Sequence, residues 1–240
     1  MAIRLRIEVP LTPPTVFKTQ DSVHNLLVHA MAQHGYHLPR NQPARWGFGV
    51  IRRPVSSIPT SLPLFHLQRI IVGSTDREIA DVLAQLTPDD LTELSQVPGS
   101  GLDLRHAQII HDRSWIPTAV LPIAPISPVR VLEHGPRGSI ALLQLGPTWE
   151  ARLNHVMTRR FDRPFAIRVI PDDIYLRERG GRVCTQLPVK SMPKTHRPVV
   201  LPGLQFPAIL TGPEADLRDA WFNGLGAGTG MGFGCLGTAG

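Results

Sequence analysis

The chain has 240 residues, of which 42% are hydrophobic and 18% charged, and it carries a net charge of +6 at pH 7. This length allows one large domain or two small ones, each able to bury its own hydrophobic core, so a disordered chain is not the default expectation. No stretch approaches the ~20 consecutive apolar residues of a membrane span, and the first residues alternate apolar with charged side chains instead of forming an apolar signal sequence, so we expect a cytoplasmic protein.

The first half of the chain has the element order of one ferredoxin-like domain. Alternating apolar and charged residues predict a strand over 2–9, and apolar residues at helical spacing before Gly35 predict a helix over about 21–34. Two strands are expected over 46–53 and 64–72, a helix over 76–86, a further short helix that begins at 87–90, and a last strand over 104–114. The order strand, helix, strand, strand, helix, strand predicts a ferredoxin-like domain over 1–116.

The second half repeats this order after a proline cluster. Four prolines between 117 and 128 predict a linker over 117–124. Beyond it we expect strands over 129–132, 139–145, 165–170 and 231–236 and helices over 147–160 and 213–222. We also expect an extended segment over 199–211 and a basic hairpin or long loop over 172–197. The predicted fold class is therefore α+β, with two ferredoxin-like domains in tandem, the second over 125–240.

Positive charge is concentrated in one window of the second half. Residues 152–197 have a local net charge of +7, which is typical of a protein that binds a polyanion. Most of the cations are arginines, which favour bidentate phosphate contacts, although a GC-rich genome gives the same preference. We expect nucleic acid to bind through the cations of this window, namely Arg159, Arg160, Arg163, Arg177, Arg179, Arg182, Lys190, Lys194 and Arg197. For Arg159, Arg160 and Arg163 the alternative is a solvated helix end without a binding role.

The most distinctive motif is a glycine-rich run that follows the last predicted helix. It reads Gly224-Leu225-Gly226-Ala227-Gly228-Thr229-Gly230-Met231-Gly232-Phe233-Gly234. Alternate glycines let the backbone approach another group closely, and successive N–H groups can bind phosphate oxygens, so Gly226, Gly228, Gly230 and Gly232 are candidate nucleic-acid contacts. The run lacks the Gly-Lys-Ser/Thr ending of a P-loop and follows a helix instead of preceding one, which excludes both common nucleotide-binding motifs.

This run, between the last helix and the last strand, resembles the glycine-rich loop of the CRISPR repeat-processing endoribonucleases of the RAMP superfamily. The resemblance is strongest over 198–237, and the alternative is a glycine-rich tail of some other α+β protein. The many arginines and the segment 67–73 are also similar to the variants attached to type IV systems. The resemblance implies two ferredoxin-like domains and the cleavage of precursor CRISPR RNA within its repeats.

The same resemblance implies a reaction without metal or other cofactor. The 2′-hydroxyl attacks the adjacent phosphorus and leaves a 2′,3′-cyclic phosphate, which requires a base, an acid and a cation near the phosphorane. It also implies that the mature guide RNA stays bound in an effector complex with other subunits. The alternative is a non-catalytic RAMP-fold RNA-binding subunit of a CRISPR ribonucleoprotein, and a third option is an RNA-binding ferredoxin-like pair outside CRISPR, which would leave the glycine-rich run unexplained.

The resemblance places the catalytic groups on the first helix and the loop after it. Histidine serves either proton transfer because its pKa lies near neutrality. His37 is the first candidate, since it follows the helix stop, and Tyr36 and Arg40 beside it would position the RNA or stabilise charge. His24 and His29 are the next candidates, although His29 points away from the apolar face and has solvent exposure as its alternative.

Other residues of this region have expected roles too. His34 projects onto the apolar face and is expected to pack in the core or cap the helix. Some members of the family rely on Arg or Lys alone, in which case Arg40 and Arg45 would stabilise the phosphorane, and Arg45 is also an expected RNA contact. No metal site is predicted, because Cys184 and Cys235 have no thiolate partners at zinc-site spacing, and we expect both to be buried free thiols.

Overall fold

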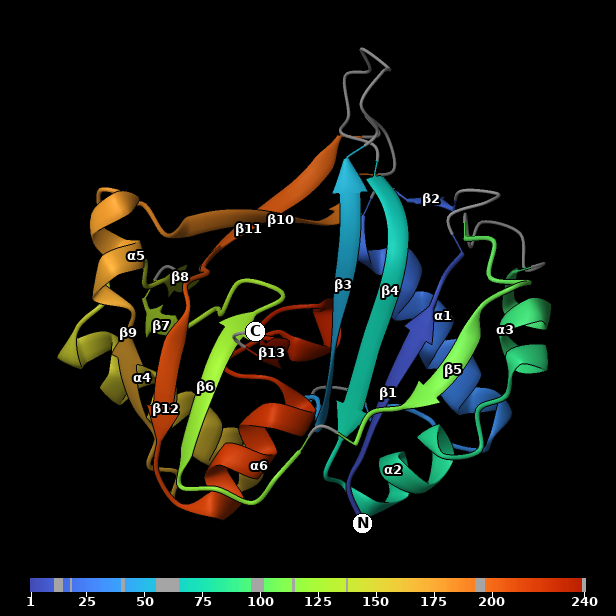
Figure 1. Cartoon of the computed structure of the whole chain (residues 1–240), viewed down its shortest axis with the longest axis horizontal. Helices are drawn as coiled ribbons and strands as arrows, with labels where there is room; N and C mark the ends of the chain where they lie inside the picture. Colours follow the sequence, from blue (N-terminus) through green and yellow to red (C-terminus); the bar gives the residue numbers. More distant parts are fainter. Residues whose placement is uncertain are drawn as a thin grey trace.

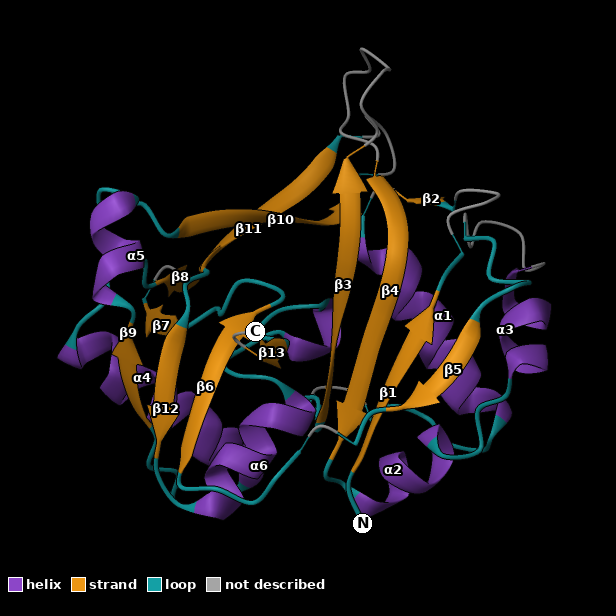
Figure 2. Ribbon diagram, viewed as in Figure 1, coloured by secondary structure: helices purple, strands orange, loops and turns teal. Residues whose placement is uncertain are grey.

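The computed structural model describes residues 1–10, 15–17, 19–39, 42–54, 65–95, 102–113, 115–136, 138–192 and 197–238. Two antiparallel sheets stand side by side, one built from the first half of the chain and the other from the second half (Figures 1 and 2). Each sheet has its own hydrophobic core, the first around Leu27 and Ile70 and the second around Trp149 and Leu210. Among the described residues no helix is long and apolar enough to cross a membrane.

The first half has the predicted order of a ferredoxin-like fold. Its main elements are β1 (Ile3–Glu8), α1 (Gln20–Gln33), β3 (Trp46–Pro54), β4 (Phe65–Ser74), α2 (Arg77–Leu83) and β5 (Gln108–His111), with a short β2 (Val16–Phe17) beside β4 and α3 (Pro88–Ser95) before β5. β4 and β1 lie in the middle, between β3 and β5, and every pairing is antiparallel. α1 buries the apolar face that its spacing predicted, from Val23 to Met31.

The second half repeats this topology with two insertions. Its sheet has the order β13-β6-β12-β9, which matches the strand order of the first sheet. The elements are β6 (Val120–Pro125), α4 (Pro147–Phe161), β9 (Arg168–Pro171), β12 (Ala208–Thr211), α6 (Glu214–Asn223), the 3-10 turn η1 (Thr229–Met231) and β13 (Leu236–Thr238). The inserted elements are the hairpin β7 (Leu132–Gly135) and β8 (Gly138–Ala141), the helix α5 (Asp173–Glu178), and the ribbon β10 (Cys184–Ser191) and β11 (Pro198–Leu204). The predicted fold class, two tandem ferredoxin-like domains, is therefore confirmed.

One predicted segment has a different structure. Residues 120–124 of the expected linker belong to β6, which pairs with both β12 and β13 in the middle of the second sheet. Pro122 and Pro125 lack backbone N–H donors, which is why the sequence did not indicate a strand there. The strand forms because Ile123, between them, is buried in the second core.

The ends of three other predicted elements also differ. The expected strand over 231–236 is part of the glycine-rich loop, and β13 begins only at Leu236. The expected basic hairpin or long loop over 172–197 contains the helix α5 and the strand β10, and β10 pairs antiparallel with β11. The extended segment over 199–211 is divided between β11 and β12. Cys235 is buried as expected, whereas Cys184, on the ribbon, is exposed.

Candidate active site

The glycine-rich run packs along the seam, the buried interface between the two halves of the chain. Gly230 packs so closely on the first half that a Cβ atom there would lie 3.0 Å from the Cβ atom of Ala44. The fit is mutual, because a Cβ atom on Gly47 of β3 would lie 2.2 Å from the carbonyl oxygen of Asn223 at the end of α6. The distance at Gly47 is far below van der Waals contact, so only glycine allows these two backbones to meet, whereas a Cβ atom on Gly230 would be tight against Ala44.

Arg160, near the end of α4, joins the two halves by hydrogen bonds within this seam. Its guanidinium donates to the carbonyl oxygens of Ala44 at 2.6 Å and Trp46 at 3.1 Å in the first half, and to those of Asn223 at 2.7 Å and Gly224 at 2.9 Å in the second. Complete burial lowers the pKa of Arg160 to about 9. The expectation that Arg160 contacts RNA is therefore wrong, because the backbone of both halves uses its donors.

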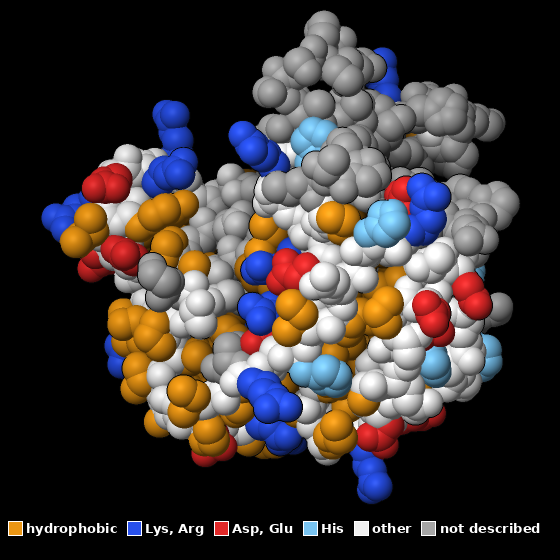
Figure 3. Space-filling view, turned by 45° about the vertical axis from the view of Figure 1, so that its right-hand side comes forward, with side chains coloured by type: hydrophobic (Ala, Val, Ile, Leu, Met, Phe, Trp, Pro, Cys, Tyr) orange, Lys and Arg blue, Asp and Glu red, His pale blue; other side chains and the backbone are white. Residues whose placement is uncertain are grey.

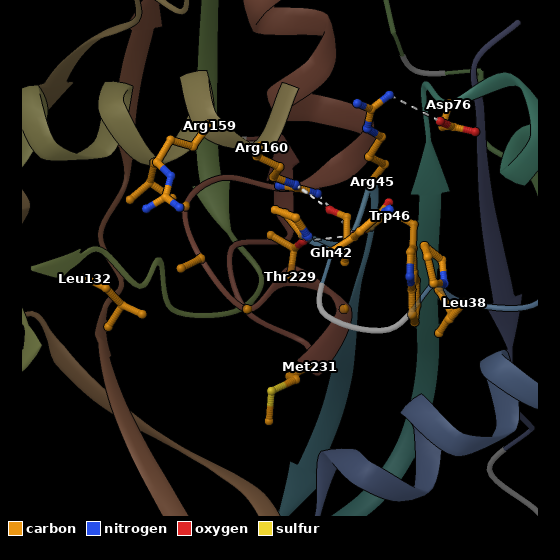
Figure 4. A pocket seen from close by; sticks show the side chains of 18 of the residues that line it. Leu38, Gln42, Arg45, Trp46, Asp76, Leu132, Arg159, Arg160, Thr229 and Met231 are labelled. Carbon is orange, nitrogen blue, oxygen red and sulfur yellow. Dashed lines mark hydrogen bonds and ion pairs between the residues drawn. The ribbon is translucent and has the colours of Figure 1, made fainter. Parts of the chain in front are cut away.

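A cavity of 960 Å³ opens beside this seam, and both halves line it. Figure 4 shows Arg159 and Arg160 extending from α4, Thr229 beside Trp46 in the middle, and Arg45 directed towards Asp76. The first half contributes His24, Tyr36, His37, Arg45, Asp76 and Glu78, and the second half contributes His134, Arg152, His155, Arg159 and the glycine-rich backbone over 226–231.

His24 is held between the two halves. Its Nδ1 lies 2.6 Å from the carbonyl oxygen of Gly230, and its ring stacks on Trp46 with the ring centroids 5.9 Å apart. A carbonyl oxygen only accepts hydrogen bonds, so Nδ1 carries the proton and the neutral ring keeps its lone pair on Nε2. His24 can therefore accept a proton or a hydrogen bond within the cavity.

His37 and Tyr36 follow α1 on the same side of the cavity. His37 is exposed, and its ring has no hydrogen-bond partner within the described part of the chain. Burial and the nearby carboxylates of Asp76 and Glu78 raise the pKa of Tyr36, whereas Arg45 lowers it. Tyr36 therefore keeps its proton at neutral pH and can donate a hydrogen bond.

The structure brings most of the predicted residues of the first half together but not all of them. His24, Tyr36, His37 and Arg45 line one cavity. His29 does not line it, because it is exposed and its Nδ1 lies 2.7 Å from the carbonyl oxygen of Asn25, one turn earlier on α1. Arg40 lies outside the described residues.

Two further expectations concern helix ends and the glycine-rich run. His34 caps the end of α1, which is one of the two roles that its position on the helix predicted, and it also contacts a carboxylate oxygen of Asp90 at 3.2 Å. Gly226, Gly228 and Gly230 line the cavity. Gly232 does not, because it is buried against Gln20 and Phe48, so its role is packing between the halves.

The expected RNA-binding cations fall into separate groups. Arg163 forms ion pairs with Asp216 and, at 2.5 Å, with Asp219. Burial lowers its pKa, but these two carboxylates outweigh that effect and raise it. Arg163 therefore has two partners within the protein, and its expected RNA contact stays a prediction. Lys194 lies outside the described residues.

The remaining cations are exposed on the inserted elements of the second half. Arg177, Arg179 and Arg182 lie on α5 and the turn after it, Lys190 lies on β10, and Arg197 directly precedes β11. Figure 3 shows Lys and Arg side chains projecting from the left-hand lobe of the molecule. None of these five residues lines the large cavity, so these cations lie apart from it.

Sequence reasoning missed two histidines on the far wall of the cavity. His155 lies on α4, and His134 lies on β7 with its Nδ1 2.7 Å from the hydroxyl of Ser139. The signal for His155 was present, because Arg152, His155 and Arg159 share one face of a helix that was predicted. Among the described residues no group of three or more His, Cys, Asp or Glu side chains is placed to hold a metal ion.

Solved structures with the same fold cover the whole chain. A Cas6-related protein from Pyrococcus furiosus matches with a TM-score of 0.71 and 16% identity, over 99% of this chain and 98% of that one. A CRISPR-associated protein Cas6 matches with a TM-score of 0.64 and 12% identity over 100% of both chains. A RAMP protein described as binding different RNA substrates matches with a TM-score of 0.61 and 16% identity, over 98% of both chains.

No protein-family model and no curated protein sequence matches the chain. The similarity therefore lies in the fold, which is the fold of Cas6 and RAMP proteins. It agrees with the resemblance that the glycine-rich run indicated, whereas nothing in these comparisons distinguishes a type IV variant.

Proposed function

We propose that this chain is a metal-independent endoribonuclease that cleaves precursor CRISPR RNA within its repeats. The observation that carries this proposal is the cavity between the halves, where histidines and arginines from both halves meet. The shared fold supports it, because the same fold is found in Cas6 proteins. The 2′-hydroxyl attacks the adjacent phosphorus, and the products are a 2′,3′-cyclic phosphate and a free 5′-hydroxyl.

The first-half wall of the cavity has the groups that activate a 2′-hydroxyl. His37 takes the proton, since its ring is exposed and free of other partners in the described structure. His24 is the second choice because its Nε2 keeps a lone pair. Tyr36 donates a hydrogen bond that orients the RNA, and Arg45 stabilises the charge on the phosphorane.

Exposed cations outside the cavity bind the rest of the RNA. Arg177, Arg179 and Arg182 near α5, together with Lys190 on β10 and Arg197 directly before β11, contact phosphates beyond the cleavage site. Contacts of this kind keep the product bound after cleavage, which a protein that retains its guide RNA in an effector complex with other subunits requires.

The second candidate is a RAMP-fold RNA-binding subunit without catalysis. One observation favours it: a RAMP protein with this fold is described as binding different RNA substrates. Both candidates use the same cavity and the same exposed cations, so RNA binding alone does not separate them. Only cleavage does.

The test is cleavage of a synthetic repeat RNA and of the same RNA with a single 2′-deoxy sugar at the mapped cut site. We expect the unmodified RNA to be cut and the deoxy RNA to be bound equally well but left intact. His37→Ala should slow cleavage of the unmodified RNA by about 100-fold or more. Tight binding without cleavage would favour the non-catalytic subunit, and cleavage of the deoxy RNA at the same site would contradict the 2′-hydroxyl mechanism.

A further inference from the structure

The two walls of the cavity differ in charge. The first-half wall contains Arg45 but also the carboxylates of Asp76 and Glu78. The second-half wall contains Arg152 and Arg159, and none of the second-half residues that line the cavity in the described structure is acidic. A phosphate group is attracted to the wall without carboxylates. The scissile phosphate should therefore lie against α4, with its 2′-hydroxyl side towards the first half.

His155 lies at the centre of this cationic wall. Arg152 precedes it by three residues and Arg159 follows it by four, so all three side chains leave the same face of α4. The helix is a rigid support, because Leu153 and Met157 on its other face are buried in the second core. Arg152 also donates from Nε to the carbonyl oxygen of Leu132 at 2.8 Å, which joins the helix to β7.

Both ring nitrogens of His155 are available. The side chain is exposed to the cavity and has no hydrogen-bond partner within the described residues. His134, the other histidine of this wall, has its Nδ1 occupied by Ser139 at 2.7 Å. Of the two, His155 is therefore the histidine that can turn either nitrogen towards a bound phosphate.

We propose that His155 is the general acid of the reaction, a role that rests on the function proposed above. In an in-line attack the entering 2′-oxygen and the leaving 5′-oxygen are on opposite sides of phosphorus, so base and acid must come from opposite walls. His37 removes the proton of the 2′-hydroxyl while the bond between O2′ and phosphorus forms. The bond between phosphorus and O5′ breaks, and protonated His155 gives its proton to O5′. Each histidine then exchanges its proton with water.

A substrate with sulfur in place of the leaving 5′-oxygen tests this role directly. A thiolate leaves without being protonated, so such a substrate does not need a general acid. The repeat RNA is first mapped with the wild-type protein, and the sulfur is then placed at that one position. We expect His155→Ala to cut the oxygen substrate about 100-fold or more slowly and the sulfur substrate within a few-fold of the wild-type rate.

Two control variants complete the experiment. His37→Ala, which removes the base, should be slow on both substrates. His106→Ala removes an exposed histidine that does not line the cavity and should cut both at the wild-type rate.

Three outcomes would overturn the assignment, and they are distinguishable. If His155→Ala cuts the oxygen substrate at the wild-type rate, His155 takes no part in the reaction. An equal loss on both substrates would mean that His155 only binds the phosphate. Failure of the wild-type protein to cut either substrate would instead overturn the proposed function, and this inference with it.

Discussion

Arginines are buried in one region of this molecule, the seam between the halves, and exposed in another, the outer edge of the second half around α5. At the seam Arg4 and Arg160 are almost inaccessible to solvent. Arg4 donates to the carbonyl oxygen of Trp221 at 3.0 Å and to that of Leu236, and its guanidinium lies 4.0 Å from the centroid of the Trp221 ring. Arg160 binds four carbonyl oxygens from both halves.

The outer edge contrasts with this seam. Arg177, Arg179 and Arg182 are exposed on and after α5. The difference shows that a count of cations in a sequence window does not measure a binding surface. A buried guanidinium stabilises the fold where hydrogen-bond acceptors satisfy its donors, and an exposed one contributes little to stability but can bind phosphate.

The largest expected effect is the loss of a seam arginine. Arg160→Ala should lower the free energy of unfolding by about 3 kcal/mol or more, because it removes the donors for four carbonyl oxygens, three of them in buried hydrogen bonds, and leaves a cavity. The neighbouring Arg159→Ala is the matched control, since Arg159 is exposed, and should change stability by no more than about 0.5 kcal/mol. Urea unfolding of both variants measures the difference, and equal midpoints would contradict the buried role of Arg160.

A methyl group in the seam should have a similar but smaller effect. Gly47→Ala places a Cβ atom 2.2 Å from the carbonyl oxygen of Asn223, so the halves must separate locally, which should cost about 2–3 kcal/mol of stability. Gly135→Ala is the control outside the seam, where the nearest atom would be 3.7 Å away. Thermal unfolding followed by circular dichroism should show a lower midpoint for the Gly47 variant only, and an unchanged midpoint there would contradict the close packing of the seam.

Changes at the outer edge should affect RNA binding and leave stability unchanged. Replacing Arg177, Arg179 and Arg182 together with Ala should weaken binding of the repeat RNA about 10-fold and lower the slope of log affinity against log salt by about 2. Arg77→Ala removes an exposed arginine of α2 on the first half and should change neither quantity. Fluorescence anisotropy across a salt series gives both numbers, and a triple variant with wild-type affinity would place the RNA elsewhere.

The smallest expected effect is a difference in thiol reactivity between the two cysteines, one at the seam and one on the ribbon. Burial raises the pKa of the Cys235 thiol at the seam to about 11, whereas Cys184 on the ribbon is exposed. At pH 8 a thiol reagent should therefore modify one cysteine in the folded protein and the second only after unfolding. The variant Cys184→Ser should show no reaction until it unfolds, and rapid modification of that variant would contradict the buried seam.

The raised pKa also has a consequence for stability. The unfolded thiol ionises at lower pH than the folded one, so the unfolded chain loses its proton first as pH rises. The contribution of the Cys235 thiol to the free energy of unfolding is complete below the unfolded pKa of 9.0 and is lost as pH rises towards about 11. Cys235→Ala should remove this part of the decline in stability between pH 9 and 11.

Much of the fold could be predicted because local patterns determine its elements. The alternation in β1 and the spacing of apolar residues from Val23 to Met31 identify a strand and a helix without knowledge of the rest. β6 was missed because two prolines are poor strand formers locally, and only the burial of Ile123 between two partner strands decides the outcome. That burial depends on residues far away in the sequence.

The candidate site was predictable on one wall only. The cluster of histidines after residue 23 and the family resemblance together indicated His24, Tyr36 and His37, which line one cavity. Arg160 was misassigned because its partner Ala44 is 116 residues away, and no local pattern indicates that the other half covers the end of α4. His155 was not predicted, because the resemblance implies catalytic groups on the first helix and the loop after it, and His155 lies on α4 of the other half.

The most direct test of the central claim is the chemistry of the cut ends when no metal is available. The wild-type protein is incubated with its repeat RNA in EDTA, and the products are identified by mass spectrometry. The proposed mechanism predicts cleavage at one position, with a 2′,3′-cyclic phosphate on the upstream fragment and a 5′-hydroxyl on the downstream fragment. Cleavage that requires added magnesium, or a 5′-phosphate on the downstream fragment, would contradict it.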